Sequence, residues 1–122
     1  MQGSQSFSAT NRLRNSREFS RVWREGQRCH TRSLTVIVAP PAIADQDGAR
    51  LGVTVSRKVG NAVCRNRIKR WIREYFRTSR QRLISAADLS VIAKPGAALL
   101  AHGEFDRELQ EAMRRLRLYQ DA

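Results

Sequence analysis

The chain has 122 residues, enough for one domain with a single core and too few for a second. It carries 23 Lys and Arg against 11 Asp and Glu, a net charge of +12, which points to a polyanion such as nucleic acid as the usual partner. Cys29 and Cys64 are too few for a disulfide framework or a zinc site, and no segment reaches the roughly 20 apolar residues of a membrane span. We therefore predict a cytoplasmic protein with reduced thiols and no membrane contact.

The N-terminal part of the chain divides into an arm and a helix. Residues 1–10 are polar and show no regular spacing, so we expect a flexible arm ahead of a single domain over residues 11–122. Apolar residues then recur at helical spacing, which predicts a short helix that begins at Asn15 or Ser16 and ends at Gly26.

Alternating apolar and polar residues predict three strands in the remainder of the chain. The segments are "RSLTVIVAP" at 32–40, "RLGVTVSRKVG" at 50–60 and "DLSVIAK" at 88–94. An apolar stripe running to Tyr119 predicts a final helix that begins near Gly103 or Glu104. Together with a long central helix, these elements indicate an α+β fold with one sheet.

The central helix is predicted over residues 62–82 and contains the most basic stretch, "RNRIKR". At 100° per residue, an apolar arc forms from Cys64, Ile68, Trp71, Ile72, Tyr75 and Phe76. The rest of the circumference carries Arg65, Asn66, Lys69, Arg70, Arg73 and Arg77. We therefore expect Ile68 to anchor the helix to the core while the basic side faces outward.

Charge is concentrated around this helix. Between Arg50 and Arg82, eleven cations stand against a single acid, Glu74. Like charges four residues apart, such as Arg65 and Lys69, destabilise a free helix, so an anionic partner is expected to offset the repulsion. The alternatives are a solvated helix face, or a basic amphipathic helix that binds a membrane surface or a peptide groove.

The sequence offers little for protein catalysis of phosphodiester cleavage. Metal-assisted hydrolysis needs convergent carboxylates, and an acid–base nuclease commonly uses paired histidines. His30 and His102 fall in different elements with no motif around them, so we interpret both as ordinary surface or loop histidines. We predict no catalytic residue and no metal ligand in this chain.

Residues 52–77, "GVTVSRKVGNAVCRNRIKRWIREYFR", resemble the signature of the bacterial ribonuclease P protein subunit, and "NRLRNSREFSRVWREG" at 11–26 is similar to the first helix of that family. The resemblance implies a two-layer αβ sandwich with three helices, a single mostly antiparallel sheet of about four strands, and a left-handed β-α-β crossover. It also implies a non-catalytic subunit of the tRNA 5′-end endoribonuclease. In that holoenzyme the RNA subunit is the catalyst and uses Mg²⁺, while the protein binds no cofactor.

The resemblance also implies two partners, the ribonuclease P RNA and precursor tRNA, with one protein per RNA. RNA-subunit binding is assigned to Arg65, Asn66, Arg67, Lys69, Arg70, Arg73 and Asn61. Binding of the single-stranded 5′ leader is assigned to Phe19, Trp23, Thr54, Ser56, Arg57, Lys58 and Lys94. Ile37 stands where several relatives carry an aromatic residue in the central strand.

Other interpretations remain open for these residues. Asn66 could serve as a cap or turn residue, and Phe19 and Trp23, four positions apart on a short helix, could belong to the core. A ribosomal-type or general RNA-binding protein without a role in cleavage would share the same charge.

Overall fold

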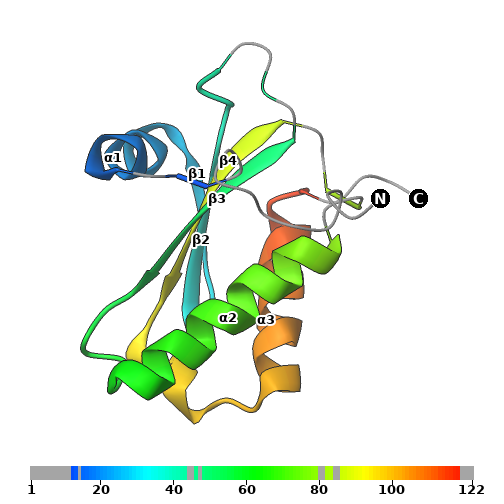
Figure 1. Cartoon of the computed structure of the whole chain (residues 1–122). Helices are drawn as coiled ribbons and strands as arrows, with labels where there is room; N and C mark the ends of the chain where they lie inside the picture. Colours follow the sequence, from blue (N-terminus) through cyan, green and yellow to red (C-terminus); the bar gives the residue numbers. More distant parts are fainter. Residues whose placement is uncertain are drawn as a thin grey trace, which may run out of the picture.

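The computed structural model describes residues 12–13, 15–43, 46, 48–79, 82–83 and 86–118. The described chain forms three α-helices and four strands, and the strands make one sheet (Figure 1). In order, these elements are α1 (Ser16–Glu25), β1 (Gln27–His30), β2 (Leu34–Ala39), β3 (Ala49–Val55), α2 (Ala62–Ser79), β4 (Ala87–Ala93), the 3₁₀ helix η4 (Pro95–Leu99) and α3 (His102–Arg115). The α+β prediction is confirmed, whereas the predicted arm over residues 1–10 and the end of the stripe at Tyr119 lie outside the described residues.

The sheet has the strand order β1-β2-β4-β3. β1 pairs with β2 and β2 with β4 in antiparallel fashion, while β3 and β4 are parallel, so the sheet is mostly antiparallel but mixed. The chain passes from β3 to β4 through α2, which makes this the predicted β-α-β crossover; its left hand stays an expectation from the resemblance. Strand β1 was missed because its short segment buries a single side chain, Cys29, which is too little for a pattern.

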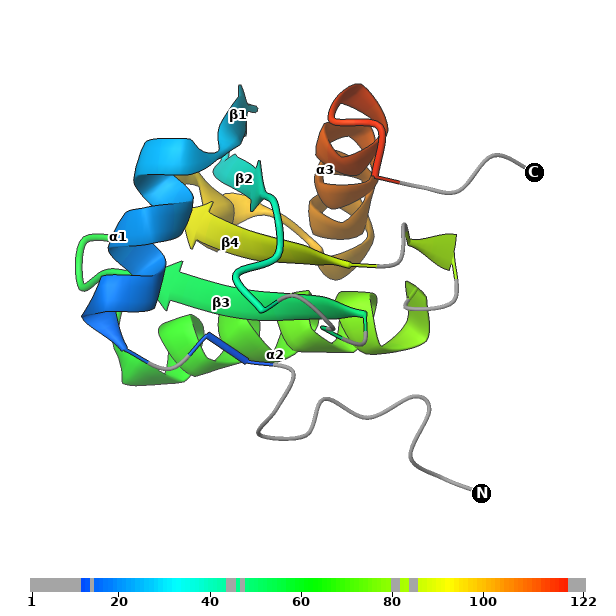
Figure 2. The same cartoon turned by 90° about the horizontal axis from the view of Figure 1, so that it is seen from above.

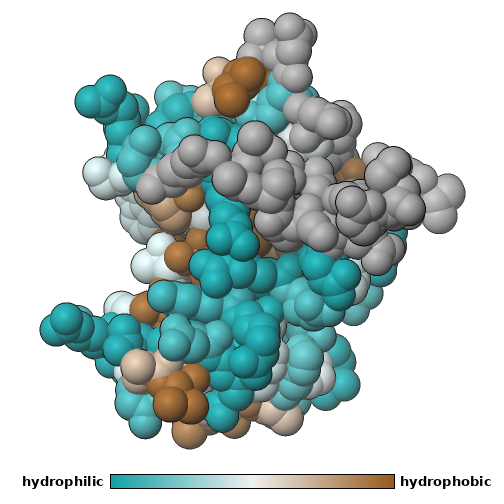
Figure 3. All heavy atoms as spheres, viewed as in Figure 1, coloured by the Kyte–Doolittle hydropathy of each residue, from teal (hydrophilic) through white to brown (hydrophobic). Residues whose placement is uncertain are grey.

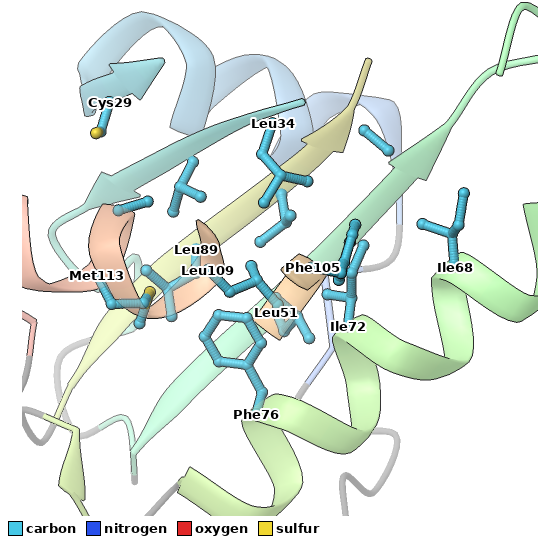
Figure 4. Close-up of a cluster of buried hydrophobic side chains, with 14 of the residues drawn as sticks. Cys29, Leu34, Leu51, Ile68, Ile72, Phe76, Leu89, Phe105, Leu109 and Met113 are labelled. Carbon is cyan, nitrogen blue, oxygen red and sulfur yellow. The ribbon is translucent and has the colours of Figure 1, made fainter. Parts of the chain in front are cut away.

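The main core lies between one face of the sheet and the pair α2 and α3. Figure 4 shows Ile68, Ile72 and Phe76 pointing from α2 toward the sheet, beside side chains of α3 such as Phe105. All four are fully buried. The predicted orientation of the central helix is therefore confirmed, with Ile68 as a core residue inside a basic segment.

Helix α1 packs on the opposite face of the sheet (Figure 2). Because successive strand residues point to opposite faces, Val36 belongs to the main core while its neighbour Ile37 contacts the α1 side. A second, smaller cluster results, built from Leu13, Val22, Ile37 and Ala39 with Phe19 packed against it. Since α1 has only 10 residues, part of this sheet face stays uncovered.

Two sequence predictions about the chain as a whole can be compared with this fold. Cys29 and Cys64 are both free in the structure, and their reduced state stays a prediction. Within the described ranges, no helix is long and apolar enough to cross a bilayer.

Candidate nucleic-acid interface

A cleft of about 450 Å³ opens between α1 and the uncovered part of the sheet. In Figure 3 the outline of the molecule is hollowed between α1 and the beginning of α2. The cleft is lined by Phe19, Ser20, Trp23 and Arg24 of α1, and by Ile37, Thr54, Ser90 and Ile92 of the sheet. The helix that forms its wall is delimited by local signals, since the Asn15 side chain accepts a hydrogen bond from the Glu18 amide at 3.0 Å and Gly26 ends the helix.

A buried ionic cluster fastens α1 to the sheet. The fully buried carboxylate of Asp88 accepts hydrogen bonds from Arg50 Nε at 3.0 Å, from Arg50 Nη2 at 3.1 Å and from Arg21 of α1 at 3.1 Å. Glu18 of α1 lies 2.9 Å from Arg50 on its other side. Arg50, one of the eleven cations between residues 50 and 82, therefore adds little to the surface charge, because its charge is neutralised inside the fold.

Opposing influences set the protonation of this cluster. Burial is the largest single influence, and it raises the pKa of Asp88. Hydrogen bonds from Arg50 and Gln46 and the positive charge of Arg50 lower the pKa, and together they outweigh burial. The pKa of Asp88 therefore lies below its ordinary value of 3.8. Asp88 is therefore an anion across the neutral range, and α1 is held by charge as well as by apolar contact.

The two aromatic residues of α1 differ in their surroundings. Phe19 is half-buried and lies against Gly52 of β3, where an added Cβ atom would approach Phe19 Cε1 to 2.4 Å. Trp23 is 46% exposed, and the guanidinium carbon of Arg28 sits 4.1 Å from its ring centroid. Arg28 also donates to the Trp23 carbonyl at 2.6 Å, so one face of the indole is covered and the ring is held at the cleft. The core interpretation thus fits Phe19 in part, and Trp23 is the open ring.

The remaining residues assigned to the leader lie at or beyond one end of the cleft. Thr54 lines it, and Ser56 and Lys94 follow the last residues of β3 and β4. The Lys94 ammonium donates to the Thr31 carbonyl at 2.7 Å, which engages one of its three donors. Arg57 and Lys58 are exposed in the turn that leads from β3 to α2.

The start of α2 is capped by Asn61. Its side-chain oxygen accepts from the Cys64 amide at 2.9 Å, and its carbonyl accepts from the Arg65 amide at 2.9 Å. The capping role considered for Asn66 therefore falls on Asn61, while Asn66 is exposed on the outer face of the helix.

A second hollow of about 420 Å³ runs along the outer face of α2, and we call it the α2 groove. Its lining brings together four of the residues assigned to the RNA subunit, joined by an arginine from before α1: Arg12, Asn66, Lys69, Arg70, Arg73, Glu74 and Arg77. The surface over α2 is hydrophilic (Figure 3). Glu74, the one acid of the lining, is hydrogen-bonded to Arg77 at 3.2 Å, so it leaves the other cations uncompensated.

Arg65 and Arg67 do not line the α2 groove. Arg65 donates from Nε to the Gly60 carbonyl at 3.1 Å, and Arg67 lies on the other flank with its guanidinium 5.4 Å from the Trp71 ring centroid. Trp71 in turn stacks on His102 of α3, with centroids 4.7 Å apart and planes 4° from parallel. The "RNRIKR" segment thus spreads its cations around the helix, because residues two apart differ by about 200° in direction.

The two histidines have local partners. His30 Nδ1 is 2.9 Å from the Thr35 hydroxyl, and His102 Nε2 is 3.5 Å from Asp106. Across the described segments, no three His, Cys, Asp or Glu side chains come together as a metal site.

Comparison with known proteins gives this geometry a context. Residues 7–117 match the family model for ribonuclease P. The chain belongs to the ribonuclease P protein family. The ribonuclease P protein component of Syntrophus aciditrophicus is 40% identical over 98 residues, covering 80% of each chain. That of Bacillus pumilus is 39% identical over 110 residues, covering 90% of this chain and 91% of the relative.

Solved structures of ribonuclease P proteins share the fold. The Staphylococcus aureus protein superposes with a TM-score of 0.82 at 30% identity, over 90% of this chain and 98% of that chain. Membership of the ribonuclease P protein family connects the chain with tRNA processing as a ribonuclease P component.

The sequence analysis missed three residues that shape the two hollows of this ribonuclease P family member. Arg12, which precedes the first helix, lines the α2 groove, and Arg28, on the unpredicted strand β1, covers one face of Trp23. Asp88 holds α1 through Arg21, a pairing that the sequence does not reveal. The spacing of Arg28 five residues after Trp23 is only a weak indication of their contact. The other contacts, such as that of Arg50 with Asp88, join residues far apart in the chain and leave no local pattern.

Proposed function

We propose that the chain is the protein subunit that binds ribonuclease P RNA through the α2 groove and the single-stranded 5′ leader of precursor tRNA through the cleft. It thereby assists removal of the leader in tRNA 5′ maturation. The observation that carries the proposal is the pairing of an aromatic-walled cleft with an adjacent groove of uncompensated cations.

The chemistry of each hollow suits its assigned partner. Single-stranded RNA is held by stacking of bases on aromatic rings and by cations along the backbone, without a base code. Trp23 offers one open ring face, and Thr54 and Ser90 line the floor with hydroxyl groups. Lys69 and Arg70 line one groove, from which their charges can contact phosphates of a folded RNA.

In this proposal the catalyst is the RNA subunit, one protein binds each RNA, and Mg²⁺ belongs to the RNA-containing holoenzyme. Three of the described acids fit this division of labour, since Asp88, Glu74 and Glu111 are each engaged by arginines of the same chain. The protein contributes binding and orientation of the precursor next to the reacting phosphodiester.

Reconstitution tests the proposal. The purified chain is added to a bacterial ribonuclease P RNA at low Mg²⁺, and leader cleavage is expected to be restored. In the same assay Trp23→Ala is expected to weaken precursor binding by about tenfold, as for loss of one stacked base, while assembly with the RNA subunit stays unchanged. Trp71→Phe is the matched control, because Trp71 lies on the far flank of α2 and stacks on His102.

Two other functions make different predictions. A general RNA-binding protein would give the complex equal affinity for precursor and mature tRNA, and that result would remove the leader-binding proposal. A membrane-surface or peptide-groove module needs the apolar face of α2, but Ile68, Ile72 and Phe76 are fully buried against the sheet and α3. Binding to anionic vesicles at physiological salt would revive it.

A further inference from the structure

A small niche shares lining residues with both the cleft and the α2 groove. This niche, of about 80 Å³, is lined by Phe19, Arg12 and Arg73 together with Leu13 and residues of β3. Phe19 also lines the cleft, and Arg12 and Arg73 also line the α2 groove. The two hollows that the proposed function gives to two different RNAs therefore meet at one point on the surface.

Arg12 is positioned at this junction by its backbone. It forms a parallel bridge with Leu51 of β3, and the amide of the next residue, Leu13, donates to the Leu51 carbonyl at 3.1 Å. Leu13 is buried in the smaller core. The backbone of Arg12 is thus fixed beside β3, while the residue as a whole is exposed.

Arg73 reaches the same place from α2, where the burial of its neighbour Ile72 fixes the direction of the helix face. The pKa of Arg73 is lowered first by partial burial and then by the positive charge of Arg12, so the two guanidinium groups repel each other. No acid in the described part of the chain pairs with either of them. Arg50, by contrast, is compensated on both sides by Asp88 and Glu18.

We propose that Arg12 and Arg73 together bind one backbone phosphate of the leader strand where it leaves the cleft past Phe19. The proposal rests on the proposed function, and it adds a phosphate site and a residue, Arg12, that the motif does not contain. Two guanidinium groups around one phosphate make charge-assisted, bidentate hydrogen bonds and relieve their mutual repulsion. The leader is the favoured source because Phe19, which lines the cleft, also lines the niche.

The test uses the complex of this chain with a bacterial ribonuclease P RNA. Precursor tRNAs carry a single uncharged methylphosphonate linkage at successive leader positions, and their dissociation constants are measured with the wild-type chain and with Arg12→Gln. At one leader position the uncharged linkage is expected to cost the wild type about tenfold in affinity and the variant almost nothing. Arg73→Gln is expected to behave alike at that same position.

Salt dependence gives a second readout. For Arg12→Gln, the slope of log affinity for precursor against log salt is expected to be shallower by about 0.7, the value for one phosphate of a single strand. Arg107→Gln is the matched control, because Arg107 is exposed on α3 and lines neither the niche nor either of the two hollows. Equal melting temperatures of the variants exclude a folding defect.

Three results would overturn the phosphate site. The first is an uncharged linkage that costs wild type and Arg12→Gln the same at every leader position. The second is an Arg12→Gln variant that loses affinity for the RNA subunit alone and retains full affinity for the leader. The third is Arg12-dependent binding of inorganic phosphate to the isolated chain with no effect on precursor. In each case, a loss of precursor affinity in Trp23→Ala would still support leader binding in the cleft. Failure of the phosphate site can therefore be distinguished from failure of the proposed function.

Discussion

Asp88 allows the clearest test of how α1 is held over the sheet. Asparagine at this position keeps the shape of the side chain but removes the charge that faces Arg50 and Arg21. Asp88 is fully buried and the Arg50 side chain is 8% exposed, so the arginine would be left as a poorly compensated buried charge. Breaking such a pair costs about 3–5 kcal/mol, and because Glu18 remains beside Arg50 we expect about 3 kcal/mol for Asp88→Asn.

Urea denaturation measures this loss directly, and a melting temperature lower by about 10 °C is expected in parallel. Glu111→Gln is the matched control, since Glu111 pairs with Arg115 on the exposed side of α3 and its loss should change stability little. A loss below about 1 kcal/mol for Asp88→Asn, or an equal loss in the two variants, would refute the reasoning about the buried cluster.

The same substitution predicts a change in the acid limb of stability. Folding lowers the pKa of Asp88 below its ordinary value of 3.8, because hydrogen bonds from Arg50 and Gln46 outweigh the opposing effect of burial. The stability from this group is therefore complete above pH 3.8 and is lost as the pH falls through the lower folded value. The difference in unfolding free energy between wild type and Asp88→Asn should stay constant at neutral pH and shrink in acid; a constant difference down to the acid transition would contradict the assignment.

Three further substitutions probe the core, the cleft and the α2 groove. Ile68→Asp is expected to abolish cooperative thermal unfolding, since it buries a charge at a cost of several kcal/mol; a stable variant that had merely lost RNA binding would show that the phase of α2 is wrong. Gly52→Ala, whose Cβ would meet Phe19 at 2.4 Å, is expected to displace that ring and weaken precursor binding while costing about 1–3 kcal/mol in urea denaturation, and unchanged precursor affinity would argue against a role of Phe19. Lys69→Ala is expected to weaken assembly with the RNA subunit. The slope of log affinity against log salt concentration is expected to become shallower by the amount for about one phosphate contact, and an unaltered slope would place Lys69 outside the interface.

Local pattern predicted the elements with strong periodicity and missed those without it. The α2 helix was predicted over residues 62–82 and is described as Ala62–Ser79, with Ile68, Ile72 and Phe76 on its buried side. Its period is a property of the backbone, so the sequence alone reveals which face carries apolar groups. Strand β1 has no such period, because it is an edge strand held by pairing with β2.

The site divides in the same way. That the surface of α2 carries cations follows from sequence, as does the placement of aromatic rings on α1. Which cations remain uncompensated does not follow, since the partner of Arg50 stands 38 residues further along the chain and is brought to it by the parallel pairing of β3 with β4. Arg12 and Arg73 become neighbours because α2 and the segment before α1 both pack beside β3. The sequence by itself thus determined the strongly periodic elements and the sign of the surface charge. Tertiary packing decided which charges cancel, because cancellation depends on distance in space, which the order of residues does not specify.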